Sequence, residues 1–321
     1  MRCSGVSCAM EQKEQGVDAF PREVGESPPA APVVITKRTW VTWSAVLICV
    51  GVFVGLNLEG DKHSWAVLSR FGFLPPEQIW AGAWWGTMTS TFVHIAPVHA
   101  FFNLYWLWQL GRLMEDEIGS LRFLVFYLGA ALICATRQLA VSDTTGIGAS
   151  GVVYAIFGFM WRSRPAYPRF QQIIVRSTIQ VFFVWLVICF FLTAGDILPI
   201  ANAAHLSGLI FGVAVAECFV MRQRRAPLIA AAFVLAGAAL VPLWWAPWSV
   251  SWQGVKAHED IVAGRVDEAI ERLNFMIKRD PKNAWAYGNR GGLYLERGET
   301  DRAAADLKRA RELKNASDTR E

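Results

Sequence analysis

Long apolar runs alternate with short polar segments between about residues 40 and 248. A run of roughly 20 apolar residues is long enough to cross a bilayer as a helix. The pattern predicts seven membrane-spanning helices, at residues 41–58, 91–113, 121–141, 149–162, 173–194, 202–221 and 227–248. The fourth is short, which a helix tolerates when its polar start lies in a protein-lined cavity and not in lipid.

The chain is polar on both sides of this apolar region. Residues 1–38 contain prolines and charges of both signs and no apolar run, which predicts a disordered cytoplasmic tail and not a cleavable signal peptide. Residues 249–321 have a soluble, helical composition. The sequence thus divides into a tail, a membrane domain over residues 39–248 and a small carboxyl-terminal domain.

An internal repeat with a period of 34 residues marks the carboxyl-terminal domain. Three positions of the first unit recur in the second: Gly264, Ala269 and Leu273 return as Gly298, Ala303 and Leu307. This period is typical of the tetratricopeptide helix pair. The predicted fold class is therefore all-α: a polytopic membrane helix bundle with seven spans, followed by a small soluble α-helical repeat domain.

Composition and charge support a multi-pass plasma membrane protein of the bacterial inner-membrane type. Hydrophobic residues make up 54% of the chain and charged residues 18%. Cations gather in three segments, at residues 37–38, 162–176 and 222–225. By the positive-inside rule this distribution predicts a cytoplasmic amino terminus and, after seven spans, an extracytoplasmic carboxyl terminus. The net charge of +4 then needs no nucleic-acid partner, and the six scattered cysteines imply no disulfide framework.

In this topology the second, fourth and sixth spans run in the same direction, so their first turns lie at one depth. Five polar side chains belong to these three ends: His94, His99, Asn103, Ser150 and His205. Polar groups in the hydrocarbon layer are costly unless they face a protein interior or water. Their coincidence in depth makes the group a candidate functional site.

Ser150 and His205 suggest nucleophilic chemistry. A serine hydroxyl attacks well only when a base takes its proton, and imidazole is the usual base near neutral pH. We therefore predict Ser150 as nucleophile and His205 as base. No carboxylate accompanies His205 on its helix, so the sequence indicates a dyad and not a triad.

A tetrahedral intermediate needs hydrogen-bond donors for its oxyanion. His99 and Asn103 are four residues apart on one helix face, and the N–H of Ser150 lies in a first helical turn. These three groups are the predicted oxyanion hole. Gly148 and Gly151 allow close backbone approach beside them.

These segments resemble the rhomboid family of intramembrane serine proteases over about residues 85–216. The resemblance is carried by four motifs: His94-Ile-Ala-Pro-Val-His99-Ala-Phe-Phe-Asn103, Gly111-Arg-Leu-Met-Glu-Asp-Glu-Ile-Gly119-Ser120, Gly146-Ile-Gly148-Ala-Ser150-Gly151-Val-Val-Tyr154 and Ala204-His205-Leu-Ser-Gly208-Leu-Ile-Phe-Gly212. It implies a six-helix core plus a seventh span, the site roles given above, and a Tyr154 ring that stacks on the imidazole. Family members often have Trp-Arg where this chain has Trp85-Gly86, which concerns the loop ahead of the second span.

Three further residues have structural interpretations. His94 is expected to make structural hydrogen bonds, and no Cys or carboxylate spacing beside it suggests a metal. Glu115 is expected to bind loop backbone or pack helix ends. Gly208 and Gly212 form a small-xxx-small pair that predicts close packing of the sixth span on the fourth. No metal and no cofactor are expected.

The function predicted from these observations is a serine endopeptidase that cleaves transmembrane-helix substrates near the extracytoplasmic membrane surface. Its expected partners are transmembrane protein substrates, membrane lipid and a protein partner at the repeats. The alternative is a non-proteolytic client-binding or adaptor protein that uses the repeat domain. A transporter is disfavoured, because it would be expected to have charged residues at mid-membrane in several spans, and the single candidate is Arg137, near the outer end of the third span. The repeats themselves either recruit substrates or adaptors, or form a plain cap.

Overall fold

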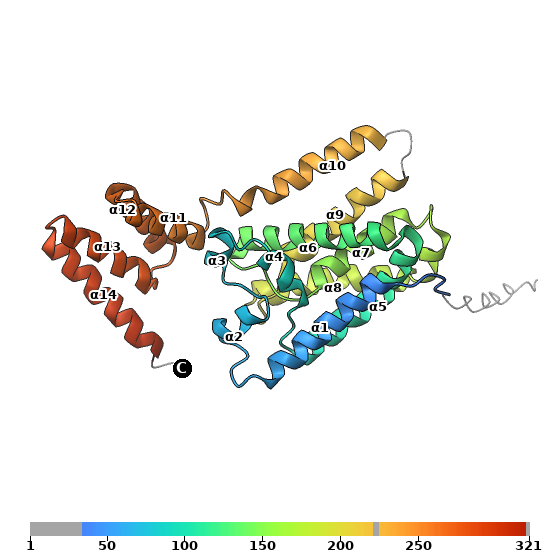
Figure 1. Ribbon diagram of the computed structural model, residues 1–321, viewed down its shortest axis with the longest axis horizontal. Coiled ribbons are helices and arrows are strands. Elements are labelled where there is room, and N and C mark those ends of the chain that lie inside the picture. The colour runs from blue at the N-terminus through green and yellow to red at the C-terminus, as the bar shows by residue number, and fades with distance from the viewer. Residues whose placement is uncertain (1–33, 221–224, 319–321) are drawn as a thin grey trace, which may run out of the picture. The chain divides into compact units, whose positions relative to one another are not determined.

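The computed structural model describes residues 34–220 and 225–318, which fold into helices joined by loops (Figure 1). The α-helices of the apolar region are α1 (Trp40–Leu58), α2 (Trp65–Arg70), α3 (Pro76–Trp80), α4 (Gly86–Thr89), α5 (Pro97–Ile118), α6 (Ser120–Ser142), α7 (Ser150–Ser163), α8 (Arg176–Ala194), α9 (Asn202–Val220) and α10 (Arg225–Leu240). Those of the repeat region are α11 (Val250–Val262), α12 (Val266–Arg279), α13 (Ala284–Glu296) and α14 (Thr300–Asp318). Short 3₁₀ turns cover Ser90–Phe92, Pro168–Gln172 and Val241–Leu243. No strand occurs in these described ranges, so the all-α prediction is confirmed.

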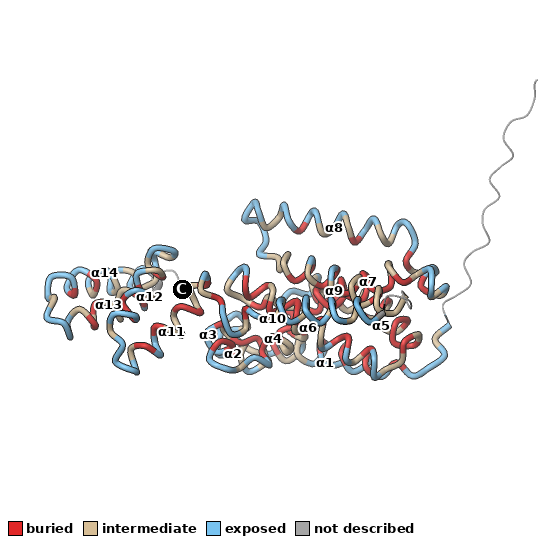
Figure 2. The backbone as a smooth tube through the Cα atoms, turned by 90° about the horizontal axis from the view of Figure 1, so that it is seen from above, coloured by how far each residue is buried: buried red, intermediate tan, exposed pale blue. Residues whose placement is uncertain are grey.

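Among the described residues, five helices are long and apolar enough to cross a membrane: α1, α6, α8, α9 and the stretch Ala226–Leu243. The chain is a multi-pass membrane protein. The other two predicted spans correspond to α5 and α7. Most of the 14 residues of α7 are buried by neighbouring helices, whereas α8 is exposed along most of its length (Figure 2). The short length of α7 is therefore compatible with the bundle, because protein surrounds this helix.

Two predicted span boundaries differ from the structure because of proline. The second span was expected to begin at residue 91, but α5 begins at Pro97 after an extended Ala96. Proline favours the first position of a helix and disfavours helical backbone in the residue before it. His94 therefore lies in the loop ahead of α5. The seventh span was expected to reach residue 248, but α10 ends at Leu240 and a 3₁₀ turn containing Pro242 follows.

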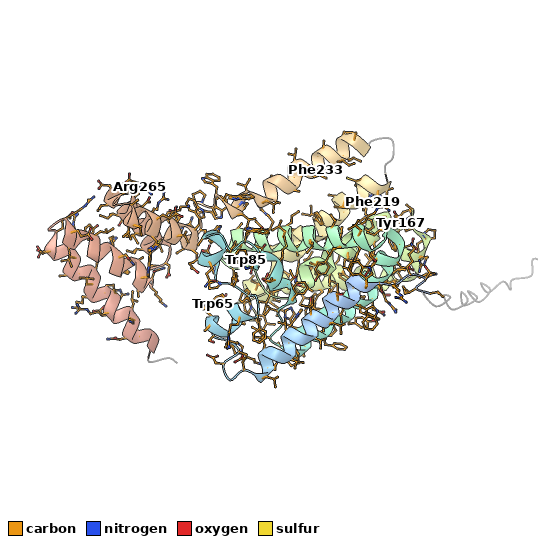
Figure 3. The ribbon with its side chains drawn as sticks, in the orientation of Figure 1. Trp65, Trp85, Tyr167, Phe219, Phe233 and Arg265 are labelled. Atoms are coloured by element: carbon orange, nitrogen blue, oxygen red, sulfur yellow. The ribbon has the colours of Figure 1, made fainter. Side chains whose placement is uncertain are left out.

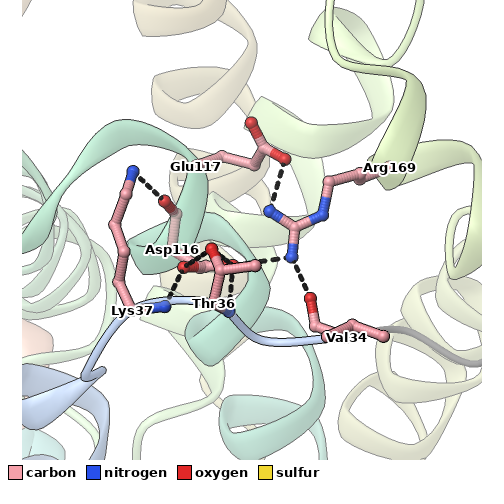
Figure 4. A network of polar contacts seen from close by, with 6 residues as sticks. All are labelled: Val34, Thr36, Lys37, Asp116, Glu117 and Arg169. Carbon is pink, nitrogen blue, oxygen red and sulfur yellow. Dashed lines mark hydrogen bonds and ion pairs between the residues drawn. The ribbon is translucent and has the colours of Figure 1, made fainter.

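Asp116, near the end of α5, binds residues of the predicted tail (Figure 4). Its fully buried carboxylate accepts hydrogen bonds from the N–H groups of Thr36 and Lys37, at 3.1 and 2.7 Å, and an ion pair from Arg169 at 2.6 Å. Residues 34–38, placed in the tail by the sequence, therefore begin the ordered domain; residues 1–33 lie outside the described residues. The contact also brings the cation-rich segments 37–38 and 162–176 to the same end of the bundle, as the topology argument requires.

The Glu115 side chain binds the free N–H groups at the amino-terminal end of α1. Its carboxylate accepts hydrogen bonds from the N–H groups of Val41 and Thr42, at 3.0 and 2.8 Å, and from the hydroxyls of Thr42 and Ser120. First-turn N–H groups lack partners within their own helix, and a carboxylate there is also favoured by the helix dipole. The expectation that Glu115 binds backbone is confirmed by these contacts.

The helices α7 and α9 pack backbone against backbone. A Cβ atom added to Gly208 would lie 2.1 Å from the carbonyl oxygen of Gly151, and one added to Gly212 would lie 1.9 Å from that of Ala155. Both separations are far below van der Waals contact, so only glycine fits at either position. The predicted close approach of these two helices is confirmed. At the far end of the pair, Arg162 and Glu217 form a bidentate ion pair.

The repeat region consists of the helix pairs α11/α12 and α13/α14, which enclose a small apolar core that includes Ala257, Leu273 and Leu293. Gly264 and Gly298, one period apart, both have positive φ, at 71° and 75°. Burial opposes the charged form of Asp260, but hydrogen bonds from Arg272 and Arg265 outweigh it and hold the pKa of that carboxyl below its ordinary value.

Replacing Gly212 by alanine tests the helix contact. We expect Gly212→Ala to lower the free energy of unfolding of the purified protein in detergent by about 1–3 kcal/mol, because the added methyl group forces α7 and α9 apart. The measurement is thermal unfolding. Gly237→Ala in α10 is the matched control, since a Cβ there meets no atom within 4 Å. Alanine is the better helix former, so equal destabilisation of both variants would contradict the packing argument.

Candidate active site

Ser150 is the first residue of α7 and follows a glycine-rich loop. α6 ends at Asp143, which has a left-handed backbone with φ of 52°. Gly146 and Gly148 in the loop also have positive φ, at 71° and 95°. These turns reverse the chain within a few residues, so α7 can begin beside the end of α6. As the first residue of a helix, Ser150 has an N–H that the helix itself does not satisfy.

His205, in the first turns of α9, faces Ser150. Its Nε2 lies 2.7 Å from Ser150 Oγ, within hydrogen-bond distance, and its ring is buried. The Tyr154 ring stacks on the imidazole with centroids 4.8 Å apart and planes inclined by 29°. The Tyr154 hydroxyl donates to the carbonyl oxygen of Phe182 in α8, at 2.9 Å. The imidazole is therefore held between the serine and an aromatic ring that is itself fixed.

The other imidazole nitrogen of His205, Nδ1, is buried and has no hydrogen-bond partner among the described residues. With Nε2 accepting the proton of Ser150, Nδ1 carries the ring proton. No carboxylate in the described part of the chain orients the ring, so we attribute its orientation to stacking on Tyr154 and to packing. The geometry is that of a serine–histidine pair.

His94 fixes the loop immediately before Ser150. The N–H of Ala149 donates to His94 Nε2 at 3.3 Å, which places the ring proton on Nδ1, where it points to the carbonyl oxygen of Phe92 at 3.2 Å. The His94 and His99 rings lie 5.1 Å apart. His94 is thus a hydrogen-bonding residue of the loop.

His99 and Asn103 occupy successive turns near the start of α5. A Cβ on Gly148 would lie 2.6 Å from Cε1 of His99, so the imidazole borders the backbone two residues before Ser150. Asn103 is buried and donates one side-chain N–H to the carbonyl oxygen of His99, at 2.8 Å. Its second N–H is left for another acceptor. The structure thus brings the ends of α5, α7 and α9 together.

Two polar contacts near the site were missed by the sequence analysis. Gln138 Oε1 accepts the N–H of Ala204 at 3.2 Å, at the start of α9, and the carbonyl oxygen of Ser90 accepts the N–H of Gly148 at 3.1 Å. Gln138 is a polar residue in an apolar span, which was the available signal. The role of the Ser90 carbonyl had no sequence signal, because it is a main-chain contact.

The loop that contains Trp85 and Gly86 is folded through contacts of its own. Its short helices α2 and α4 carry Trp65 and, at the cap of α4, Trp85 (Figure 3). Gly86 packs on Leu74, with no room for a side chain, and the Thr89 hydroxyl donates to the carbonyl oxygen of Gly72 at 2.5 Å. Gly86 is therefore part of a close helix–loop contact.

Comparison with known proteins gives two family matches. Residues 81–222 match the rhomboid domain, and residues 261–318 match the tetratricopeptide repeat. The rhomboid protease GlpG of Klebsiella pneumoniae subsp. pneumoniae is 35% identical over 184 residues, which are 57% of this chain and 64% of that protein. Rhomboid protease GlpG of Salmonella paratyphi A is 32% identical over 185 residues, 58% of this chain and 65% of that protein. The chain thus spans slightly less than two thirds of the length of these relatives.

Substitution of Gly148 tests the geometry of the loop. We expect Gly148→Ala to slow labelling of Ser150 by a fluorophosphonate about 10- to 100-fold, because the methyl group strains the positive φ and displaces His99. The control is Gly82→Ala, which has the same kind of strain at φ of 114° but no atom within 4 Å of the added carbon. Similar loss in both variants would show that strain alone, and not contact with His99, slows the reaction.

Proposed function

We propose that this protein is an intramembrane serine endopeptidase that cleaves transmembrane-helix substrates. Its chain matches the rhomboid domain over residues 81–222 and the tetratricopeptide repeat over residues 261–318. The observation that carries the proposal is the 2.7 Å separation of Ser150 Oγ and His205 Nε2 at the ends of two tightly packed helices. A hydroxyl and an imidazole inside an apolar bundle are costly, and at hydrogen-bond distance they form a nucleophile and its base.

The reaction proceeds by acyl transfer. His205 Nε2 takes the proton from Ser150 Oγ as the oxygen bonds to the carbonyl carbon of the scissile peptide. The tetrahedral intermediate collapses as the C–N bond breaks, and His205 gives the proton to the leaving amine. His205 then takes a proton from water as the water oxygen attacks the ester carbonyl, and the protonated imidazole gives that proton to Ser150 Oγ as the ester bond breaks. Stacking on Tyr154 keeps the ring in place through both halves.

The oxyanion of each intermediate is bound by the N–H of Ser150 and by side-chain donors of His99 and Asn103. His99 borders Gly148, and Asn103 has one side-chain N–H in addition to the one bound to the His99 carbonyl. Donors fixed in a water-poor site stabilise developing charge more than water does. Each such donor contributes about 3–4 kcal/mol to transition-state stabilisation in serine hydrolases of known mechanism.

Substrate reaches the site through the membrane. Of the helices at the site, α8 is the least enclosed. Its Phe182 carbonyl oxygen accepts the hydrogen bond from Tyr154, and the Phe182 ring contacts Trp106 of α5, with ring centroids 4.9 Å apart. We propose that a substrate helix approaches beside α8 and unwinds locally. In the proposed topology the ends of α5, α7 and α9 face the extracytoplasmic side, which sets the depth of cleavage.

The repeat region is proposed to bind a protein partner, such as an extracytoplasmic segment of the substrate. An apolar groove lies between α3 and the repeat helices, lined by Gln78, Gly254, Met276 and Trp285 among others. The indole of Trp285 is 44% exposed, and an exposed aromatic beside a groove is a common binding anchor.

A second candidate is a non-proteolytic protein that binds membrane clients through the same groove. The groove and the repeat match favour it. The paired Ser150 and His205 favour proteolysis, because client binding requires neither residue. Loss of client binding on changing the groove, with no cleavage by the native protein, would support this second candidate.

Substitution of the pair tests the proposed activity. We expect Ser150→Ala and His205→Ala each to reduce cleavage of a reporter transmembrane substrate by about 10⁴-fold or more, because the nucleophile or its base is removed. Purified protein in detergent would be assayed for cleavage, and Ser150 labelling by a fluorophosphonate would be measured by mass spectrometry.

The matched controls are Ser207→Ala, two residues after His205, and His63→Ala in the first loop. The Ser207 hydroxyl donates to the Ala203 carbonyl of its own helix, at 2.6 Å, so its loss should leave cleavage nearly unchanged. Cleavage that survives in Ser150→Ala would overturn the assignment of the nucleophile.

Substitution of Trp285 tests the groove. We expect Trp285→Ala to raise KM about fivefold for a substrate that keeps its extracytoplasmic segment, at unchanged kcat, because one contact of about 1 kcal/mol is lost. A substrate trimmed to its transmembrane helix should show the same KM with both proteins. An equal KM for the untrimmed substrate would exclude the groove as its binding site.

A further inference from the structure

Asp143 joins the repeat region to the loop that precedes Ser150. It ends α6 and lies seven residues before Ser150. Its carboxylate accepts hydrogen bonds from the Ser249 hydroxyl and, at 3.1 Å, from the N–H of Val250. Ser249 is the N-cap of α11, so Asp143 supplies an acceptor for the first turn of that helix.

Trp248 makes a second contact with the same end of α6. Its indole N–H donates to the carbonyl oxygen of Ala140 at 2.7 Å. Carbonyl groups in the last turn of a helix lack intrahelical donors, so this bond satisfies one of them. Residues 248–250 are therefore fixed on the carboxyl-terminal end of α6 by a side chain from each partner.

The same segment also contacts the first loop. Trp252 packs in an apolar cluster with Ile79 and Trp80 of α3 and with Leu139 of α6. The Trp80 indole donates to the carbonyl oxygen of Pro242 at 2.8 Å. The start of the repeat region thus lies against both loops that border the candidate site.

These contacts form a closed ring through the site. The loop of residues 143–149 begins at Asp143, which binds α11, and ends at Gly148 and Ala149, which bind Ser90 and His94. Ser90 and His94 follow α3 in the chain, and α3 in turn packs on α11. The position of the Ser150 backbone is therefore set at both ends of its loop by the way α11 is docked.

We propose that Asp143 is a positioning residue for Ser150: by binding the start of α11 it fixes the loop of residues 143–149, and with it the separation of Ser150 Oγ from His205 Nε2. The proposal rests on the proposed function, and it adds to partner binding a second role for the repeat region. In this role the first repeat helix is a structural part of the active site.

Two substitutions of Asp143 separate its carboxylate from its backbone conformation. Glycine adopts the observed φ without strain but has no acceptor, whereas asparagine tolerates this conformation and keeps one acceptor oxygen. We expect Asp143→Gly to slow fluorophosphonate labelling of Ser150 about 10- to 100-fold and to lower kcat for a transmembrane substrate by the same factor, with KM unchanged. Asp143→Asn should stay close to the native rate.

Removing either of two helix caps separates the effect of this contact from that of repeat stability. Ser249→Ala removes the cap of α11, which Asp143 binds, and Asn283→Ala removes the corresponding cap of α13, where Asn283 Oδ1 accepts the N–H of Ala286 at 2.9 Å. We expect slower labelling in Ser249→Ala and native labelling in Asn283→Ala. Equal slowing in both would mean that repeat stability alone matters, and would overturn the proposal.

Hydrogen exchange supplies a readout that does not depend on catalysis. The N–H groups of Gly148 and Ala149 are bonded to Ser90 and His94, and we expect both to exchange faster in full-length Asp143→Gly. Native exchange at these two amides would overturn the proposal. If native Ser150 is not labelled at all, the proposed function fails, and the exchange rates still decide whether Asp143 fixes the loop.

Discussion

The close approach of α7 and α9 is the contact on which the candidate site depends. Ser150 and His205 belong to different helices, and a 2.7 Å separation of their side chains requires helix axes closer than ordinary side chains permit. Gly208 and Gly212 provide this, because each lies directly on a carbonyl of α7. Between helices in lipid there is little hydrophobic driving force, so close backbone packing is itself a main source of cohesion. The same contact thus stabilises the bundle and brings Ser150 and His205 together.

Helix packing alone does not fix the start of α7. The loop before Ser150 has two glycines with positive φ, and it is kept in place by bonds from Gly148 and Ala149 to the first loop. Because His94 accepts from Ala149 with one nitrogen and donates with the other, its tautomer and orientation are both determined. His94 therefore has a structural role: its hydrogen bonds hold the loop that precedes Ser150.

The sequence was most informative where burial constrains residue type. The polar residues at the starts of three spans predicted that Ser150 and His205 lie together, since such groups are costly in lipid, and the period of 34 residues predicted the repeats. It was less informative where contacts depend on main-chain atoms or on loops. Hydropathy could not place the start of α5, which Pro97 decides, nor show that Asp143 meets Ser249, more than 100 residues later. The roles of His99 and Asn103 in binding an oxyanion stay predictions that rest on their placement.

The buried carboxylates at one end of the bundle are well satisfied, whereas two buried polar atoms at the candidate site have no partner in the described part of the chain. At the end that holds Asp116 and Glu115, each carboxylate accepts several hydrogen bonds, and Arg162 pairs with Glu217. At the site end, His205 Nδ1 and Asn103 Oδ1 are buried without partners among the described residues. A buried polar group without a partner costs about 1–3 kcal/mol, which a protein retains where the group has a task that packing cannot serve. The hydrogen bonds of Asp116 and Glu115 fix one end of the helices relative to one another, and the buried atoms without a described partner at the other end belong to the proposed site.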